Sequence, residues 1–158
     1  MNKQKTLKVC VGASAGGHMS QLQKLLWRSE SWPQAPSFCV TTLKSLADRL
    51  AEWGPVYVIG ECNRRKPLNA LGILVRCFQI AMKERPDVVV TTGSLPLAIF
   101  CFAAKLSGAK IVWIDSIANV EKMSLSGRIV RPISDLCLVQ WPELVENYKG
   151  VEYKGSLI

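Results

Sequence analysis

The chain has 158 residues, of which 49% are hydrophobic, and a formal net charge of +8. This length and hydrophobic content predict one domain with a buried core and exclude a disordered chain. The charge favours anionic partners such as phosphate groups, nucleic acid or an acidic membrane surface. No uncharged apolar segment reaches the roughly 18 residues of a membrane span, and the basic N-terminus lacks a signal-peptide core. We therefore expect a cytoplasmic protein.

Strand-like and helix-like segments alternate along the chain. The apolar runs that predict strands cover residues 7–13, 37–42, 55–60, 87–93, 110–116 and 135–141, with a short last run at 151–155. Helical periodicity covers residues 18–28, 45–53, 68–85, 95–108 and 142–148, and in pieces 118–133. Nearly continuous apolar strands that alternate with helices are typical of a parallel sheet covered on both faces. The sequence predicts one doubly wound, mostly parallel, Rossmann-like α/β domain over residues 1–158.

The cysteines argue against a disulfide or metal framework. No two are spaced as C-x-x-C, most lie inside apolar runs, and the chain has one histidine. We expect them to be buried small hydrophobes in a reducing compartment, with no metal site. They are Cys10, Cys39, Cys62, Cys77, Cys101 and Cys137.

A glycine loop follows the first predicted strand, in the stretch "GASAGGH". Ligands of doubly wound folds bind beyond the carboxyl ends of the strands, and a helix N-terminus favours an anion. Gly12, Ser14, Gly16 and Gly17 thus predict a phosphate or diphosphate site. The alternative is a tight turn without a ligand. The loop is no Walker A motif, and the next strand ends in Thr41 and Thr42 without an acid for a ribose.

His18 closes this loop on the first turn of the predicted helix. An imidazole there is suited to act as a general base or to donate to a phosphate. The alternative is a structural or capping histidine.

Two further strand ends carry polar residues. In "TTGSLP", Thr92, Gly93 and Ser94 form a candidate second wall of the site, unless Ser94 is a plain helix cap. After the fifth strand come Ser116, Asn119 and two acids, Asp115 and Glu121, whose spacing does not require a carboxylate pair. No Asp-x-Asp motif supports a metal.

The predicted helix over residues 68–85 has more apolar positions than one face needs, including Leu71, Leu74 and Phe78. Cations flank it. Such a surface can lie on an anionic membrane, although an ordinary core helix with a basic end is an equal alternative. The cations on which the membrane hypothesis depends are Arg64, Arg65, Lys66 and Arg76.

With these motifs placed, the sequence resembles the Alg14-like, or PssD/CpsF-type, oligosaccharide and capsule biosynthesis proteins. The resemblance lies in "GASAGGH", "VVVTTGSLP", the block "WIDSIANVEKMSLSGRIVRPISDLCLVQWPEL" and "YKGSL". It implies the acceptor-side half of a split, MurG-like GT-B glycosyltransferase in exopolysaccharide or capsule synthesis. A partner chain would bind the UDP-sugar, and the pair would transfer the sugar with inversion to a polyprenyl-diphosphate-linked saccharide.

The resemblance also implies roles and a location. It makes His18 the candidate general base or acceptor-phosphate contact and Asp115 and Glu121 secondary catalytic candidates. It places the chain at the inner face of the cell membrane, inactive without its partner, and with no cofactor or metal of its own. The identity of the sugar stays open.

Two other classes of function compete with this hypothesis. A stand-alone Rossmann-like enzyme with a nucleotide or other cofactor fits the fold, but the missing acid after the second strand argues against it. A nucleic-acid-binding domain is suggested only by the charge, and no recognition motif is present. We therefore expect no nucleic-acid partner.

Overall fold

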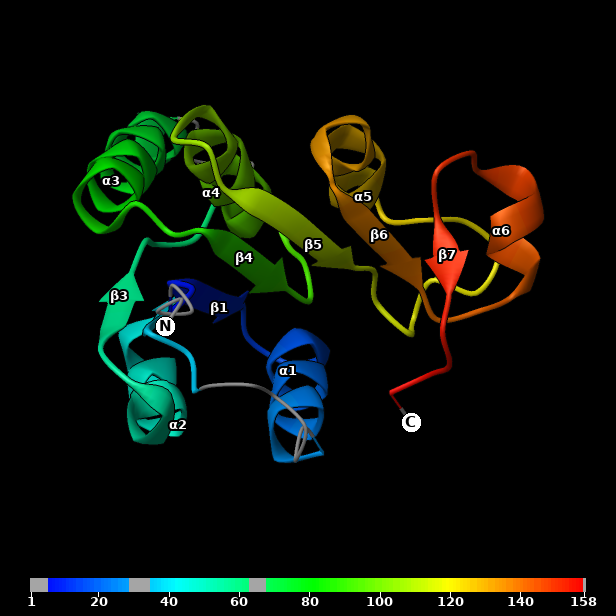
Figure 1. The fold of residues 1–158 in the computed structure, drawn as a ribbon, viewed down its shortest axis with the longest axis horizontal. Coiled ribbons are helices and arrows are strands. Elements are labelled where there is room, and N and C mark those ends of the chain that lie inside the picture. Colours follow the sequence, from blue (N-terminus) through cyan, green and yellow to red (C-terminus); the bar gives the residue numbers. More distant parts are fainter. Residues whose placement is uncertain (1–5, 29–34, 63–67, 158) are drawn as a thin grey trace, which may run out of the picture.

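A computed structural model describes residues 6–28, 35–62 and 68–157 (Figure 1). Seven strands form one sheet in the order β3-β2-β1-β4-β5-β6-β7. All six neighbouring pairs are parallel. The strands are β1 (Val9–Ala13), β2 (Phe38–Thr41), β3 (Val56–Val58), β4 (Val88–Thr91), β5 (Lys110–Ile114), β6 (Leu136–Val139) and β7 (Glu152–Tyr153). The predicted doubly wound α/β fold is confirmed.

Helices cover both faces of the sheet. In Figure 1, α1 and α2 lie on one side and α3, α4 and α5 on the other, while α6 lies beside β7. The helices are α1 (Gly17–Trp27), α2 (Ala47–Leu50), α3 (Leu68–Glu84), α4 (Leu95–Leu106), α5 (Leu125–Val130) and α6 (Glu143–Asn147).

The core has one apolar layer on each face because side chains alternate along a strand. Cys10 packs with Phe100 and Trp113 on the α4 side. Its neighbour Val11 packs with Met19 and other residues on the α1 side. Both faces of the central strands are therefore apolar and packed. These packed strands give the glycine loops at their ends a rigid support.

The segment predicted as one helix over residues 45–53 is broken. It forms a 3₁₀ turn at Lys44–Leu46, then α2, then a second 3₁₀ turn at Ala51–Trp53. Ser45 does not cap it. Its buried leucines, Leu46 and Leu50, span a single turn. Gly54, with a φ of 142°, ends the segment before Pro55.

Within the described ranges, no helix combines the length and the apolarity needed to cross a membrane. The longest, α3, ends at Glu84. Arg85 follows with a φ of 44°, because Pro86 disfavours helical backbone in the residue before it.

Candidate functional site

The strand order reverses between β1 and β4, and the two glycine loops leave the sheet at this point. Gly12 of β1 lies in register with Thr91 of β4, so both strands end at the same level. Open α/β sheets form their binding crevice where the order reverses. The structure therefore brings the "GASAGGH" and "TTGSLP" loops together.

His18 and Thr92 join the two loops. The His18 Nδ1 atom lies 2.6 Å from the Thr92 carbonyl oxygen, and the Thr92 hydroxyl donates to the His18 carbonyl at 2.7 Å. Because a carbonyl only accepts, Nδ1 must carry the proton of this bond. In the neutral ring, Nε2 then presents its lone pair, which is the form that a general base requires.

The backbone of the second loop is unusual at two consecutive residues. Gly93 has a φ of 111° and Ser94 a φ of 105°, and a side chain rarely permits the latter. A Cβ on Gly93 would stand 3.1 Å from the His18 Cε1 atom, so a glycine is needed where the ring packs.

Ser94 occupies the N-cap position of α4, but its side chain makes no capping bond. The plain helix-cap interpretation is therefore wrong. The Ser94 hydroxyl oxygen is buried and has no partner within the described chain. A strained residue with an orphaned hydroxyl beside His18 is typical of a ligand site.

The glycines of the first loop have two different roles. Gly12 lies inside β1, where a Cβ would come within 2.7 Å of the Leu97 Cδ1 atom and 3.2 Å of the Val40 carbonyl oxygen. Its predicted contact with a diphosphate is thus corrected: Gly12 allows α4 to pack on the sheet. Ser14 is also buried at the end of the strand.

Gly16 and Gly17 are exposed at the start of α1. No side chain caps this helix, and its first turn has no acidic residue. Its first backbone N–H groups and its dipole therefore face the loop without a protein anion. This half of the loop retains the geometry of an anion site.

The Asp115 side chain is buried and bonded within its own loop. The residue is 1% exposed. Its carboxylate accepts bonds from the Ser124 N–H and hydroxyl at 2.8 and 2.5 Å, and longer ones from Trp113 Nε1 and Asn119 Nδ2. We assign Asp115 to the ordering of residues 116–124.

The other polar residues of this loop do not converge on His18. Glu121 is exposed, so the structure does not pair it with the buried Asp115. The Ser116 hydroxyl accepts a bond from the Ala118 N–H at 3.3 Å. Asn119, as a donor to Asp115, also serves the loop itself.

Two buried glutamines, Gln21 and Gln140, lie next to this loop, and sequence patterns alone did not point to Gln21. Gln140 Nε2 lies 2.6 Å from Gln21 Oε1 and 2.9 Å from the Asp115 carbonyl oxygen, and Gln140 Oε1 accepts from the Leu157 N–H at 2.7 Å. Gln21 lies three positions after His18, on the same face of α1. That spacing was the available signal.

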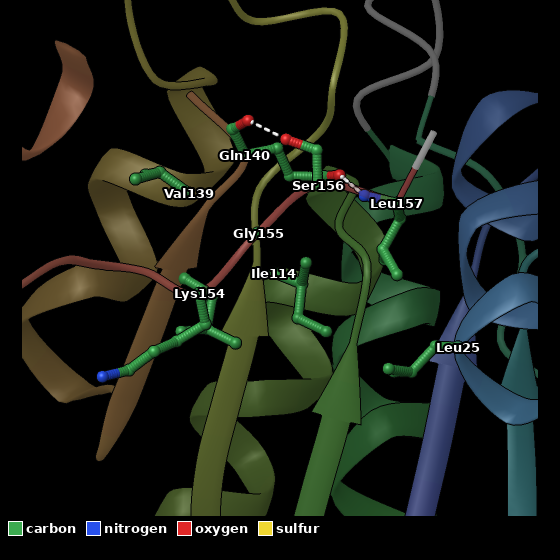
Figure 2. A pocket seen from close by; sticks show the side chains of 9 residues that line it. Leu25, Ile114, Val139, Gln140, Lys154, Gly155, Ser156 and Leu157 are labelled. Atoms are coloured by element: carbon green, nitrogen blue, oxygen red, sulfur yellow. Dashed lines mark hydrogen bonds between the residues drawn. The ribbon is translucent and has the colours of Figure 1, made fainter. Parts of the chain in front are cut away.

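The C-terminal segment lies against the ends of β5 and β6 (Figure 2). The Ser156 hydroxyl donates to the Gln140 carbonyl at 2.5 Å. Leu157 helps to line a cavity of about 280 Å³, together with Leu25 of α1 and Ile114 of β5.

The predicted membrane face falls partly on described residues. Leu71 and Leu74 of α3 are 64% and 40% exposed, and Arg76 is exposed beside them. Phe78 is half-buried in the core instead. The predicted cations Arg64, Arg65 and Lys66 lie outside the described residues.

Among the described residues, no group of three His, Cys, Asp or Glu side chains gathers in a way that could hold a metal ion. The cysteines are free, and all except the half-buried Cys62 are buried. Burial raises the pKa of the Cys39, Cys77 and Cys137 thiols to about 12.

Solved structures share the fold at low sequence identity. Acinetobacter baumannii MurG superposes with a TM-score of 0.73 at 15% identity, over 92% of this chain and 44% of MurG. UDP-GlcNAc 2-epimerase from Methanocaldococcus jannaschii gives a TM-score of 0.69 at 14% identity, over 95% and 46%. The chain thus has the fold of one Rossmann-like half of such proteins.

A family model described as "Oligosaccharide biosynthesis protein Alg14 like" matches residues 59–157. The chain belongs to this family. The protein named UDP-N-acetylglucosamine transferase subunit ALG14 of Candida albicans is 45% identical over 83 residues, which cover 49% of this chain and 38% of that protein. Its mouse counterpart is 36% identical over 87 residues, which cover 51% and 40%. The matched part spans less than half of each relative.

Proposed function

We propose that this chain is the acceptor-binding subunit of a two-chain glycosyltransferase that acts in lipid-linked oligosaccharide synthesis. The observation that carries the proposal is the match of residues 59–157 to the Alg14-like family. Relatives in the family are named as subunits of a UDP-N-acetylglucosamine transferase. A partner chain binds the UDP-sugar, and this chain binds a polyprenyl-diphosphate-linked saccharide. The chain is inactive alone.

His18 acts as the general base in this proposal. The bond from Nδ1 to the Thr92 carbonyl leaves Nε2 to accept a proton. A hydroxyl of the acceptor attacks the anomeric carbon of the donor sugar as its proton passes to Nε2, and the bond to the UDP oxygen breaks. A single displacement of this kind inverts the anomeric centre. A phosphate contact through Nε2 would need the protonated ring, so the geometry favours the base.

The acceptor's diphosphate binds at the start of α1, beside Gly16 and Gly17. The exposed N-terminal turn of α1 supplies N–H donors and a positive dipole end. The buried Ser94 hydroxyl, which lacks a partner among the described residues, lies at the opposite loop. The two loops thus flank His18.

The protein works at the inner face of the cell membrane, in exopolysaccharide or capsule synthesis. Exposed Leu71, Leu74 and Val75 on α3, next to Arg76, support a docking face for anionic lipid. A Leu71→Asp/Leu74→Asp variant should lose most flotation with anionic vesicles. Trp27→Asp, which changes a 60% exposed residue of α1 on the other side of the sheet, should float like the wild type. Equal flotation of the wild type and both variants would contradict the proposal that this face of α3 docks on the membrane.

Co-expression tests the division of labour. This chain carries a tag, and the untagged chain is the donor-binding glycosyltransferase of the same pair. The complex and each chain alone are assayed with a panel of UDP-sugars and a polyprenyl-diphosphate-linked saccharide. We expect a stable complex and transfer only when both chains are present. Transfer by this chain alone would refute the two-chain proposal, and a nucleotide copurified with an inactive chain would favour the stand-alone enzyme.

A further inference from the structure

The first turn of α1 has a buried polar neighbour for which the proposed function gives no role. Gln21 is only 4% exposed. Side chains of a helix lean toward its N-terminus, so Gln21 reaches back toward the glycine loop. Its Nε2 atom lies 3.7 Å from the point where a Cβ on Gly17 would stand.

The orientation of the Gln21 carboxamide follows from its neighbour Gln140. The Leu157 N–H can only donate, so Gln140 turns its oxygen toward it. The Asp115 carbonyl can only accept, so Gln140 turns its nitrogen there. That nitrogen also lies 2.6 Å from Gln21, which must therefore present its own oxygen to Gln140 and its NH₂ group to the loop.

The NH₂ group of Gln21 has no hydrogen-bond partner among the described residues. Because the rest of this side chain is buried, its NH₂ group is a fixed donor that faces the loop and is free to bond a ligand. The neighbouring helix start also lacks a side-chain cap and an acidic residue. Two independent features, an uncapped helix N-terminus and an oriented side-chain donor, therefore converge on one spot.

We propose that Gln21 donates a hydrogen bond to a phosphate oxygen of the acceptor's diphosphate, in an orientation held by Gln140. This inference rests on the proposed function, which puts the diphosphate at the start of α1. It adds a contact that neither glycine loop supplies. It also connects the site to the C-terminal segment, because Leu157 fixes the orientation of Gln140 and Gln140 that of Gln21.

Inorganic pyrophosphate is the probe, and calorimetric titration of the purified chain is the measurement. Gln21→Glu keeps an oxygen for Gln140 but replaces the NH₂ donor by an anionic oxygen. We expect it to weaken pyrophosphate binding by about tenfold or more. Gln23→Glu is the matched control, with the same charge change on the half-buried Gln23 of the same helix. A charge there is screened, so its affinity should stay within about twofold of the wild type.

Wild-type spectra keep the test independent of variant folding. The side-chain ¹⁵N amide resonance of Gln21 should shift when pyrophosphate is added. An unmoved Gln21 resonance, equal affinities of the two variants, or no binding to the wild type would each overturn the inference.

A transfer assay of the two-chain complex separates this failure from failure of the proposed function. Transfer by the wild-type complex without any effect of Gln21→Glu would refute the Gln21 contact alone. A complex that transfers no sugar at all would refute the proposed function.

Discussion

His18 and Thr92 hydrogen-bond each other twice across 74 positions of the chain. The ring nitrogen Nδ1 bonds the Thr92 carbonyl, and the Thr92 hydroxyl bonds the His18 carbonyl. The first bond sets the tautomer of the ring, and the second ties the turn that carries it to the neighbouring strand end. The position of the imidazole is therefore fixed by the β4–α4 loop as much as by its own helix.

His18→Ala should lower sugar transfer by the two-chain complex about 10²- to 10⁴-fold, because the proposed base is lost. The free energy of unfolding should fall by about 1 kcal/mol, which is the usual value of one hydrogen bond. Steady-state transfer assays and urea unfolding provide the two readouts. Ser20→Ala, at an exposed position two residues further along α1, is the control. Wild-type transfer by His18→Ala would remove His18 from the mechanism.

Gly93→Ala should displace the His18 ring, because the new Cβ would stand 3.1 Å from Cε1 and 3.3 Å from Nδ1. The ring must move by a few tenths of an ångström. We expect transfer to fall, by no more than the ~10²-fold cost of misplacing a reacting group by roughly 1 Å. The backbone at a φ of 111° should also cost about 1–3 kcal/mol of stability.

Gly108→Ala separates the two effects of the Gly93 change. Gly108 has a φ of 97°, but a Cβ there would meet no atom within 4 Å. Its variant should lose similar stability in thermal unfolding and keep normal transfer. Equal transfer by the Gly93 and Gly108 variants would show that the ring is not held by this contact.

Gln140→Leu should be strongly destabilising. It would leave two buried groups, the Gln21 oxygen and the Asp115 carbonyl, without this partner, at about 1–3 kcal/mol for each. The partly buried Leu157 N–H would lose its bond as well. Chemical denaturation measures the loss. Gln79→Leu makes the same change at an exposed position of α3 and should shift the midpoint little. Similar midpoints for the two variants would contradict the structural importance of this junction.

Asp135→Asn should change the pH dependence of stability. Partial burial disfavours the ionised carboxylate, but bonds from Lys105, the Ile111 N–H and Lys110 outweigh it and hold the Asp135 pKa well below its usual range. A lowered folded-state pKa stabilises the protein above the unfolded value of 3.8, and this contribution disappears as pH falls further.

We therefore expect Asp135→Asn to lower the urea midpoint at pH 7 and to bring it closer to the wild type at pH 3. Asp135 lies before β6, at the sheet edge opposite the site, so sugar transfer should be unaffected. Asp48→Asn, at an exposed position, is the control. Because the folded-state pKa lies well below 3.8, part of the difference should remain at pH 3. A difference as large at pH 3 as at pH 7 would rule out this ion cluster as its source.

Cys62 should be the thiol that reacts with maleimide first in the native protein. It is half-buried, whereas the other five cysteines are buried. Burial raises the pKa of each of them, to about 12 for Cys39, Cys77 and Cys137, which suppresses the reactive thiolate. Mass spectrometry should find one fast adduct that is absent from Cys62→Ser. Several fast adducts would show that the core opens readily.

The fold was predictable because its pattern is local. Strands such as Val88–Thr91 and Lys110–Ile114 are apolar in sequence because both faces of a parallel sheet are covered. The break in the segment around Ala47–Leu50 could not be predicted, since a single buried turn does not distinguish a helix from consecutive 3₁₀ turns. Parallel pairing also accounts for the prediction that the two glycine loops share one edge.

The site was predictable only in part. His18, Gly93 and Ser94 were named from loop chemistry, whereas Gly12 was placed in the loop although its lack of a side chain serves packing against Leu97. The spacing from His18 places Gln21 on the same face of α1, but it does not reveal the burial of Gln21 against Gln140, which lies 119 positions away. Buried polar pairs of this kind depend on tertiary structure, which one sequence does not display.

The pairing of β1 with β4 also has a consequence for synthesis. The segment that carries His18 leaves the ribosome 74 residues before its hydrogen-bonding partner. Until then, one edge of β1 has no neighbour, and an open parallel edge is slow to close and prone to wrong association. The nascent chain therefore exposes β1 for the time needed to translate α2, β3 and α3, and a chaperone that binds apolar strands would meet its target in that interval.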